Sequence, residues 1–283
     1  PDYRIDWDAV RRAITPRTRF ILLNTPNNPG SSVLTAADVA ELAAIVRATR
    51  IVVISDEVYE HMVYDGARHE SLARHGELAA RSVVIGSFGK TFHATGWKVG
   101  YALAPAALTA EIRRVHQFTV FTVNSPVQHA LAAFLADASR YEALPQFFAR
   151  KRDLFRALLA DVPLDLLPCA GSYFQLARYK AISDQPDRVF AEWMTREVGV
   201  AVIPISVFYA DGRDDRVSDE PAYAFAQRLV AEYGVASIPL SAFYRDGTDH
   251  RVIRFCFAKR EETLREAAQR LARLSTAVHA RGE

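Results

Sequence analysis

The stretch "RSVVIGSFGKT", residues 81–91, decides how the first half of this chain folds. It joins a continuous apolar run to a short loop that contains glycine and a lysine, Lys90. Two similar runs precede it, "RFILLN" at 19–24 and "RIVVISDE" at 50–57. Continuous runs of this kind are typical of parallel strands that are covered on both faces. The sequence therefore predicts three strands of a largely parallel sheet.

The segment between the first two runs has the spacing of a helix. In "TAADVAELAAIVRAT", residues 35–49, apolar residues recur every three or four positions, and Thr35 is suited to cap the helix. Strands that alternate with helices indicate a doubly wound α/β fold, in which ligands bind at the carboxyl ends of the strands. Functional residues are therefore expected just after each run, at 24–30, 56–59 and 87–90.

The remainder of the chain indicates a second, smaller unit. Residues 125–161 have a helical pattern with a bend near Pro145 and are expected to link the two parts. Strands are predicted at "GSYFQLARY" (171–179) and "IRFCFA" (253–258), and a final helix at 261–280. The predicted domains are the large α/β domain (1–124), the linking helices (125–161) and a small α+β domain (162–283).

Composition sets limits on location and partners. The 283 residues include 35 basic and 33 acidic side chains, so there is no electrostatic reason to expect binding to nucleic acid or to an anionic membrane. The two cysteines, Cys169 and Cys256, lack a C-x-x-C spacing and fit a reducing compartment, so a cytoplasmic location is expected. No run approaches the roughly 18 apolar residues of a membrane helix. No metal site is predicted.

A tandem repeat lies inside the predicted small domain. Residues 183–217 align without a gap on residues 218–252, with 19 identities in 35 positions. Chance would give roughly two identities at ordinary residue usage. Two copies are too few for a solenoid, so the repeat is interpreted as one segment copied once.

Several interpretations of Lys90 can be compared. A phosphate-binding P-loop needs four residues between its glycines, whereas two residues separate Gly86 from Gly89 here. Ser87 and Lys90 also have the S-x-x-K spacing of penicillin-binding serine enzymes, but the S-D-N and K-T-G motifs of that class are missing. If it stood alone, Lys90 would be interpreted as an exposed loop lysine.

Side chains at the other strand ends favour a covalent role for Lys90. A lysine amine attacks a carbonyl when a low pKa leaves it uncharged, and the aldehyde of pyridoxal 5′-phosphate (PLP) is such a carbonyl. PLP requires an acid at its ring nitrogen, hydrogen-bond donors at its phenolic oxygen, and hydroxyl and cationic groups at its phosphate. Suitable side chains are present in Asn28, Asp56, Tyr59, Ser87 and Lys98.

Four motifs resemble those of one enzyme family in the same order. They are "NTPNNPG" (24–30), "SDEVYEHMVYDG" (55–66), "SFGKTFHATGWKVGYALAP" (87–105) and "IRFCFAK" (253–259). The chain is similar to class I and II aminotransferases of PLP fold type I, and especially to the methionine and kynurenine aminotransferase branch. The resemblance implies a partial large domain with a mostly parallel sheet, followed by a smaller α+β domain.

The resemblance also implies a role for each motif residue in binding the cofactor. Lys90 would bond covalently to PLP and then move the α-proton of the substrate. Asp56 would keep the ring nitrogen protonated. The remaining family positions are Asn28 and Tyr59 at the phenolic oxygen, and Ser87 and Lys98 at the phosphate.

Two further positions match family residues that bind substrate. Arg254 in "IRFCFAK" corresponds to the arginine that grips the substrate carboxylate through two parallel hydrogen bonds. Asn124 in "TVNSP" corresponds to a residue near the substrate, and Tyr173 in "GSYFQ" also falls near the site. His93 and Trp97 flank the lysine loop, and for both a role in packing or loop structure is favoured at least as much as substrate contact.

The chain departs from the family pattern in two ways. Family members begin with a segment, about the first third of their length, that has no counterpart here, so the sheet is expected to leave apolar faces and edges open. That segment contains the helix N-terminus that binds the cofactor phosphate in family members. The repeat is the second departure. Because the second copy runs directly into Arg254, we expect its "GVASIPLSAFY" strand (234–244), rather than the first copy, to pair with the Arg254 strand.

The resemblance predicts an aminotransferase that moves an amino group between an amino acid, of methionine or aromatic type, and a 2-oxo acid. A PLP-dependent carbon–sulfur β-lyase would use the same lysine, aspartate and arginine. The non-enzyme alternatives are an aminotransferase-like domain of a transcriptional regulator and an inactive fragment. We expect a homodimeric parent protein, and we expect this chain alone to bind PLP poorly and to aggregate.

Overall fold

The computed structural model describes residues 3–208 and 252–274, and the chain forms two compact units. Unit 1 consists of Pro1–Arg150 and Pro168–Tyr173, and unit 2 consists of Lys151–Leu167 and Phe174–Glu283. The three-part domain division at residues 124 and 161 stays a prediction.

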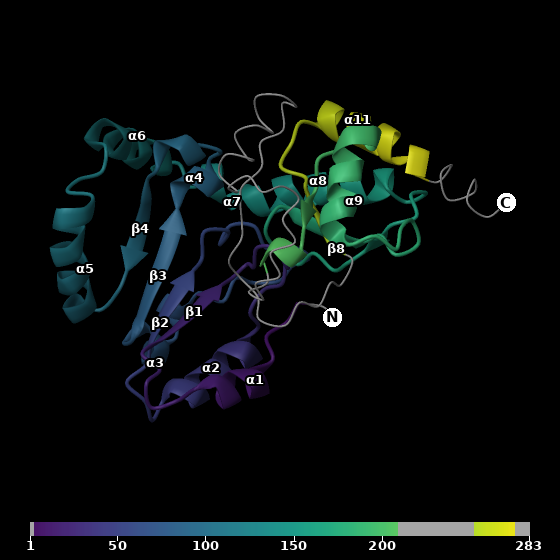
Figure 1. Ribbon diagram of the computed structural model, residues 1–283. Helices are drawn as coiled ribbons and strands as arrows, with labels where there is room; N and C mark the ends of the chain where they lie inside the picture. Colours follow the sequence, from purple (N-terminus) through teal and green to yellow (C-terminus); the bar gives the residue numbers. More distant parts are fainter. Residues whose placement is uncertain (1–2, 209–251, 275–283) are drawn as a thin grey trace. The chain divides into compact units, whose positions relative to one another are not determined.

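Unit 1 is built on a four-stranded sheet with the order β1-β2-β3-β4 (Figure 1). Its strands are β1 (Phe20–Asn24), β2 (Val52–Asp56), β3 (Ser82–Ser87) and β4 (Gly100–Leu103). The first three are parallel, and β4 is antiparallel to β3. The three strands predicted from the apolar runs and their parallel arrangement are therefore confirmed.

Helix α2 (Ala36–Val46) covers one face of this sheet. It begins at Thr35 as predicted, because the Thr35 hydroxyl accepts a hydrogen bond from the Asp38 amide and the Asp38 carboxylate accepts one from the Thr35 amide. Leu42 of α2 packs with Val53 and Val84 of the sheet in one buried cluster. The short helices α1 (Trp7–Ala13) and α3 (Gly76–Ala79) also belong to this unit.

The face of the sheet opposite α2 is exposed in β1, whereas the sequence predicted strands that are covered on both faces. In β1 the side chains of Phe20 and Leu22 are 61 % and 71 % exposed, while Ile21 and Leu23 on the opposite face belong to the core. Successive strand residues point to opposite faces, so only the face beneath α2 is buried in β1. The prediction of strands covered on both faces is wrong for β1. The expected open apolar face is present there.

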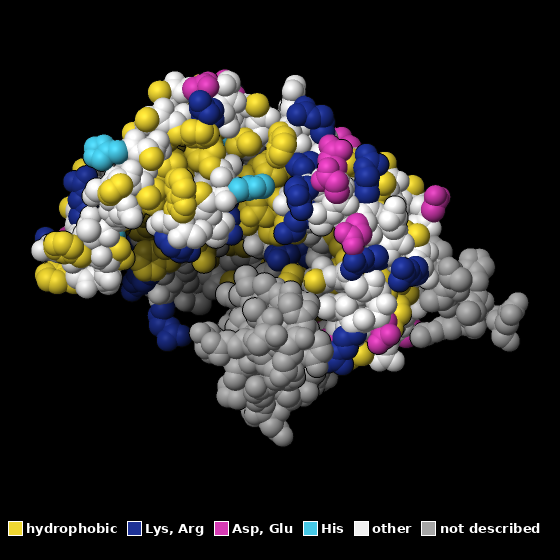
Figure 2. Space-filling view, turned by 90° about the horizontal axis from the view of Figure 1, so that it is seen from above, with side chains coloured by type: hydrophobic (Ala, Val, Ile, Leu, Met, Phe, Trp, Pro, Cys, Tyr) yellow, Lys and Arg dark blue, Asp and Glu magenta, His cyan; other side chains and the backbone are white. Residues whose placement is uncertain are grey.

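Further apolar side chains are exposed on α5 (Ala106–Thr119), which follows β4, and just beyond it. No residue of α5 is buried, and its Val115 and Phe118 are 61 % and 84 % exposed. Phe121, directly after the helix, is 78 % exposed. Figure 2 shows hydrophobic side chains gathered on the side of α5 and α6.

The helical pattern predicted at 125–161 is observed as three helices. They are α6 (Ser125–Leu135), α7 (Ser139–Glu142) and α8 (Leu144–Leu158). Pro145 is the second residue of α8, a position where the missing N–H leaves no intrahelical bond unmade. The predicted interruption near Pro145 is therefore the junction between α7 and α8.

Unit 2 contains an antiparallel sheet with the order β5-β6-β8-β7. The predicted strands are found as β6 (Phe174–Arg178) and β8 (Val252–Cys256), flanked by β5 (Asp165–Leu166) and β7 (Ile203–Pro204). Helix α9 (Asp187–Trp193) continues into a π-helical turn (Met194–Val198). The helix predicted at 261–280 is observed as α11 from Glu261 to Leu271, and positions 275–280 lie outside the described residues.

The structure corrects the prediction about the repeat. Strand β7 belongs to the first copy, and its Ile203 lies opposite Arg254 of β8. Because β6 pairs with the other edge of β8, both edges are occupied at Arg254. The expectation that the second copy pairs there is wrong, and the strand 234–244 itself lies outside the described residues.

Candidate functional site

The carboxyl ends of β1, β2 and β3 bring predicted site residues to one edge of the unit 1 sheet. Asn24 lies opposite Asp56 in the register, and its side-chain amide donates a 3.1 Å hydrogen bond to the Asp56 carbonyl. Ser87 is the last residue of the next strand. The parallel arrangement therefore places Asp56 and Ser87 as the sequence predicted.

Lys90 follows β3 on the one-turn helix α4 (Phe88–Thr91). Burial raises the pKa of Asp56, whereas the hydrogen bond from the Val58 amide and the nearby Lys90 ammonium act in the opposite direction. Lys90 therefore lies within electrostatic reach of the Asp56 carboxylate. A half-buried acid and an amine share this edge of the sheet.

Asn28 and Tyr59 lie on the loops that leave β1 and β2. The backbone amide of Asn28 donates a 2.6 Å hydrogen bond to the side-chain oxygen of Asn24, which fixes the turn at the end of β1. Tyr59 is 2 % exposed, and Tyr173 packs edge-on against its ring at 5.1 Å between centroids. Tyr173, which the sequence only placed near the site, therefore contacts a predicted cofactor residue.

The loop after Lys90 carries Lys98, His93 and Trp97. Lys98 is exposed and adopts a left-handed conformation with φ of 53°. A Cβ added to Gly89 would approach the Cα of Thr95 to 3.0 Å, so the glycine permits the loop to pack against the lysine turn. Trp97 is 54 % exposed, and the His93 ring lies 5.8 Å from that of Phe148.

The two predicted substrate residues have contacts of their own. Arg254 belongs to unit 2, where its guanidinium lies 4.0 Å from the centroid of the Phe174 ring. Asn124 is exposed and caps α6, because its side-chain oxygen accepts a 3.1 Å hydrogen bond from the Val127 amide. Substrate binding by either residue stays a prediction.

Glu57, next to Asp56, is a residue that the sequence analysis missed. Its carboxylate is 1 % exposed and accepts hydrogen bonds from the Ser55 hydroxyl at 2.9 Å and the Leu72 amide at 3.1 Å. His69 Nε2 lies 2.9 Å from its other oxygen. The only signal in the sequence was the adjacent pair Asp56-Glu57, because two of its partners, His69 and Leu72, come from a later segment that folds back.

These contacts make the stability of unit 1 depend on pH. Burial raises the pKa of Glu57, but the hydrogen bonds from His69, Ser71 and Leu72 together outweigh it and leave the pKa below its ordinary value. An acid with a lowered pKa stabilises the fold when ionised, and this contribution is lost as pH falls through the lowered pKa. We expect Glu57→Gln to reduce the free energy of unfolding at pH 7 by about 1–3 kcal/mol.

Urea unfolding between pH 3 and pH 7 measures this effect. The difference between wild type and Glu57→Gln should shrink on acidification below about pH 4. Glu111→Gln, in an exposed ion pair with Arg114, is the matched control and should change stability little. A constant difference across this range would contradict the role given to the Glu57 charge.

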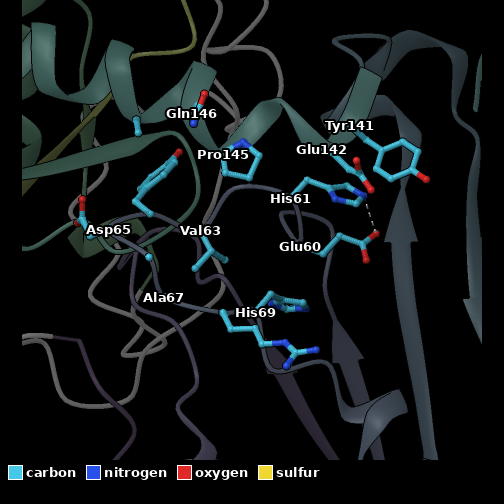
Figure 3. Close-up of a pocket in the computed structure, with 14 residues that line it drawn as sticks. Glu60, His61, Val63, Asp65, Ala67, His69, Tyr141, Glu142, Pro145 and Gln146 are labelled. Carbon is cyan, nitrogen blue, oxygen red and sulfur yellow. Dashed lines mark ion pairs between the residues drawn. The ribbon is translucent and has the colours of Figure 1, made fainter. Parts of the chain in front are cut away.

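A separate cavity of about 460 Å³ lies between the loop after Tyr59 and the α7–α8 junction (Figure 3). Its lining includes Glu60 and His61, whose Oε1 and Nε2 atoms are 3.8 Å apart, and Tyr141, Glu142 and Pro145. None of the described residues predicted to hold PLP lines this cavity. It is therefore a different place from the edge that carries Asp56 and Lys90.

Three parallel strands, a covering helix and a lysine turn beside an acid at the neighbouring strand end define an α/β protein with polar groups gathered at the carboxyl edge of its sheet. The family model for class I and II aminotransferases matches residues 1–271, and the chain belongs to this family. Its fold is that of PLP-dependent aminotransferases of fold type I. Both the predicted family and the predicted fold class are confirmed.

Particular relatives agree with the branch inferred from the motifs. Methionine aminotransferase of Escherichia coli is 43 % identical over 275 residues, which cover 97 % of this chain and 62 % of the relative. Kynurenine–oxoglutarate transaminase 1 of the rat is 36 % identical over 228 residues, covering 74 % of this chain and 54 % of the relative. A crystal structure of an E. coli protein with methionine aminotransferase function has a TM-score of 0.81 at 42 % identity, covering 96 % of this chain and 63 % of that one.

This chain therefore spans less than two thirds of the length of these relatives. Among the described residues, no helix is long and apolar enough to cross a membrane. Within the same residues, no group of three or more His, Cys, Asp or Glu side chains is placed to hold a metal ion.

Proposed function

We propose that this chain carries the lysine-bearing part of an aminotransferase that moves an amino group between an amino acid and a 2-oxo acid. The observation that supports this most directly is the placement of Asp56 and Ser87 at the ends of the neighbouring strands β2 and β3, with Lys90 just after β3 and close enough to Asp56 to oppose the rise of its pKa. Class I and II aminotransferases use PLP, which supports the same cofactor for this chain.

The chemical types at this edge fit PLP. Asp56 is a half-buried carboxylate, suited to hold a proton on the ring nitrogen of the cofactor. The Tyr59 hydroxyl and the Asn28 amide would bind the phenolic oxygen. The Ser87 hydroxyl and the Lys98 ammonium would bind the phosphate. Lys90 is the amine that would bond to the aldehyde.

When bound, PLP supplies an electron-accepting ring that stabilises negative charge at the substrate α-carbon. The Lys90 amine would remove the α-proton and return it to another carbon, which is general acid–base catalysis. Asp56 would keep the ring-nitrogen proton in place throughout. Arg254 would bind the substrate carboxylate through its planar guanidinium.

The activities for which these relatives are named favour methionine or an aromatic amino acid as donor, and we carry this over as part of the proposal. We also propose a homodimeric whole enzyme in the cytoplasm. Exposed apolar side chains, such as Val115, Phe118 and Phe121, support association with another subunit.

The test is amino-group transfer by the chain at saturating PLP, with methionine, phenylalanine or kynurenine as donor and a 2-oxo acid as acceptor. Formation of the donor's 2-oxo acid with matching gain of the new amino acid supports the proposal. Release of a thiol and ammonia from a cysteine conjugate, without transfer, would indicate a β-lyase instead. Absence of both reactions, in protein shown to bind PLP, would contradict the proposal.

A further inference from the structure

We infer that Asp187 is a positioning residue that holds the first repeat copy beside the Arg254 strand. Its side chain joins the start of α9 to the residue Ser206 just after β7, and the matching residue of the second copy, Ala222, has no side-chain acceptor. The inference rests on the proposed function only for the role of Arg254 in binding a carboxylate. The placement of β7 can be tested without any enzymatic activity.

Asp187 is a buried acid with a specific partner. It is 2 % exposed, and its two carboxylate oxygens accept hydrogen bonds from the Ser206 amide at 2.6 Å and the Ser206 hydroxyl at 2.5 Å. Hydrogen bonds in a buried, low-dielectric environment are electrostatically stronger than the same bonds in water. These two bonds fix both the backbone and the side chain of Ser206.

Ser206 stands two residues after β7, so this bond sets the position of that strand. β7 contains only two residues, Ile203 and Pro204, and proline donates no hydrogen bond to the ladder. One further bond runs from the Ile205 amide to the Val252 carbonyl at 3.1 Å. Such a short edge strand has few backbone bonds of its own, so a buried side-chain anchor at its end is a large part of what holds it.

The strand that Asp187 anchors lies directly against Arg254. Ile203 opposes Arg254 across the pair β7–β8, and Leu176 of β6 opposes it on the other side. The guanidinium packs over the Phe174 ring. Loss of β7 would leave the Arg254 backbone held on one side only, and small displacements of a binding group strongly weaken binding that depends on two parallel hydrogen bonds.

The second copy has different residues at two positions that are buried in the first copy. Thirty-five residues after Asp187 stands Ala222, which has no acceptor for a serine, although Ser241 matches Ser206. Val202, 8 % exposed, is matched by Ser237, which would bury a hydroxyl. The first copy therefore fits this place better, although both copies contain the same Ile-Pro pair.

Hydrogen exchange of the full chain tests the anchor. In Asp187→Ala we expect amides of 200–206 and of β8 to exchange at least about tenfold faster. Asp187→Asn keeps an acceptor for the Ser206 amide and should retain most of the protection, while the exposed Asp184→Ala is the matched control. Unchanged exchange at these peptides in Asp187→Ala would overturn the inference.

Two deletions test the choice between copies. Removing 218–252 leaves the first copy running into Ile253, and we expect the protection of 253–256 to be retained. Removing 183–217 leaves only the copy with Ala222, and we expect that protection to fall about tenfold. Equal protection in both deletions would contradict a deciding role for Asp187.

Substrate saturation tests the link to Arg254. If the chain transfers amino groups, Asp187→Ala should raise KM for the amino acid about tenfold with kcat changed less than about twofold, and Asp187→Asn should restore KM. A fall in kcat of about tenfold with unchanged KM would overturn the positioning role. If the wild-type chain binds PLP and shows no transfer, the proposed function fails, while the exchange results still decide whether Asp187 anchors β7.

Discussion

Replacing Lys90 by alanine should lower the rate of amino-group transfer by roughly 10²–10⁴-fold, the contribution of a positioned acid–base group. The reason is that alanine has neither an amine to bond to the PLP aldehyde nor a base for the α-proton. Lys90 is placed by the end of β3 and by the loop that packs on Gly89, so the substitution changes the chemistry and leaves the strand intact.

The bond to PLP can be measured separately from activity. The chain is mixed with enough PLP to fill even a weak site, reduced with borohydride, digested and analysed by mass spectrometry. We expect the added mass on the peptide that contains Lys90, and its loss in Lys90→Ala. Lys180→Ala replaces an exposed lysine and should keep both the label and the rate. A label mainly on another lysine would contradict the assignment.

Local patterns in the sequence predicted the elements that carry the site. The apolar runs ending at Asn24, Asp56 and Ser87 are strands in register, and Thr35 caps its helix. These signals are local, since they depend on side-chain periodicity and on hydrogen bonds between close neighbours. The edge of the sheet that gathers the acid and the lysine could therefore be predicted.

Other features depend on tertiary contacts and could not be predicted in this way. The same apolar composition fits a strand covered on one face or on both, so the run alone did not predict the exposure of Phe20 and Leu22, and the open face was expected only from the comparison with the family pattern. Glu57 finds His69 across a loop of irregular conformation. The local sequence pattern around Glu57 or His69 gives no sign that the two side chains are in contact.

The choice between the two repeat copies is the clearest case that local sequence patterns could not decide. Both copies contain the strand-like Ile-Pro pair, so periodicity cannot choose between them, and we chose the copy nearest to Arg254 along the chain. Strands adjacent in a sheet need not be adjacent in sequence, and Ile203 of the first copy pairs with Arg254. The difference that bears on the choice is Asp187, which is buried in the first copy and is replaced by Ala222 in the sequence of the second.

Replacing Asp56 by asparagine is expected to lower kcat by about 10²–10³-fold, the usual effect of removing one electrostatic stabiliser from an active site. A neutral amide would no longer hold the ring nitrogen of bound PLP in its protonated form, so the ring would accept electrons less well. Asp65→Asn, on the exposed part of the same loop, is the control and should keep its activity. Equal activity of Asp56→Asn and wild type would contradict the role of Asp56.

The stability of Asp56→Asn should not fall together with its kcat, and this difference separates a role of Asp56 in chemistry from a role in folding. Burial raises the pKa of Asp56, and an acid with a raised pKa binds its proton more tightly in the folded state. The fold therefore loses stability as pH rises from the ordinary value of about 3.9 through the raised pKa. In urea unfolding at pH 7 we expect Asp56→Asn to be as stable as wild type or slightly more stable. A variant that is inactive and no less stable identifies an acid whose charge serves the chemistry at the end of β2.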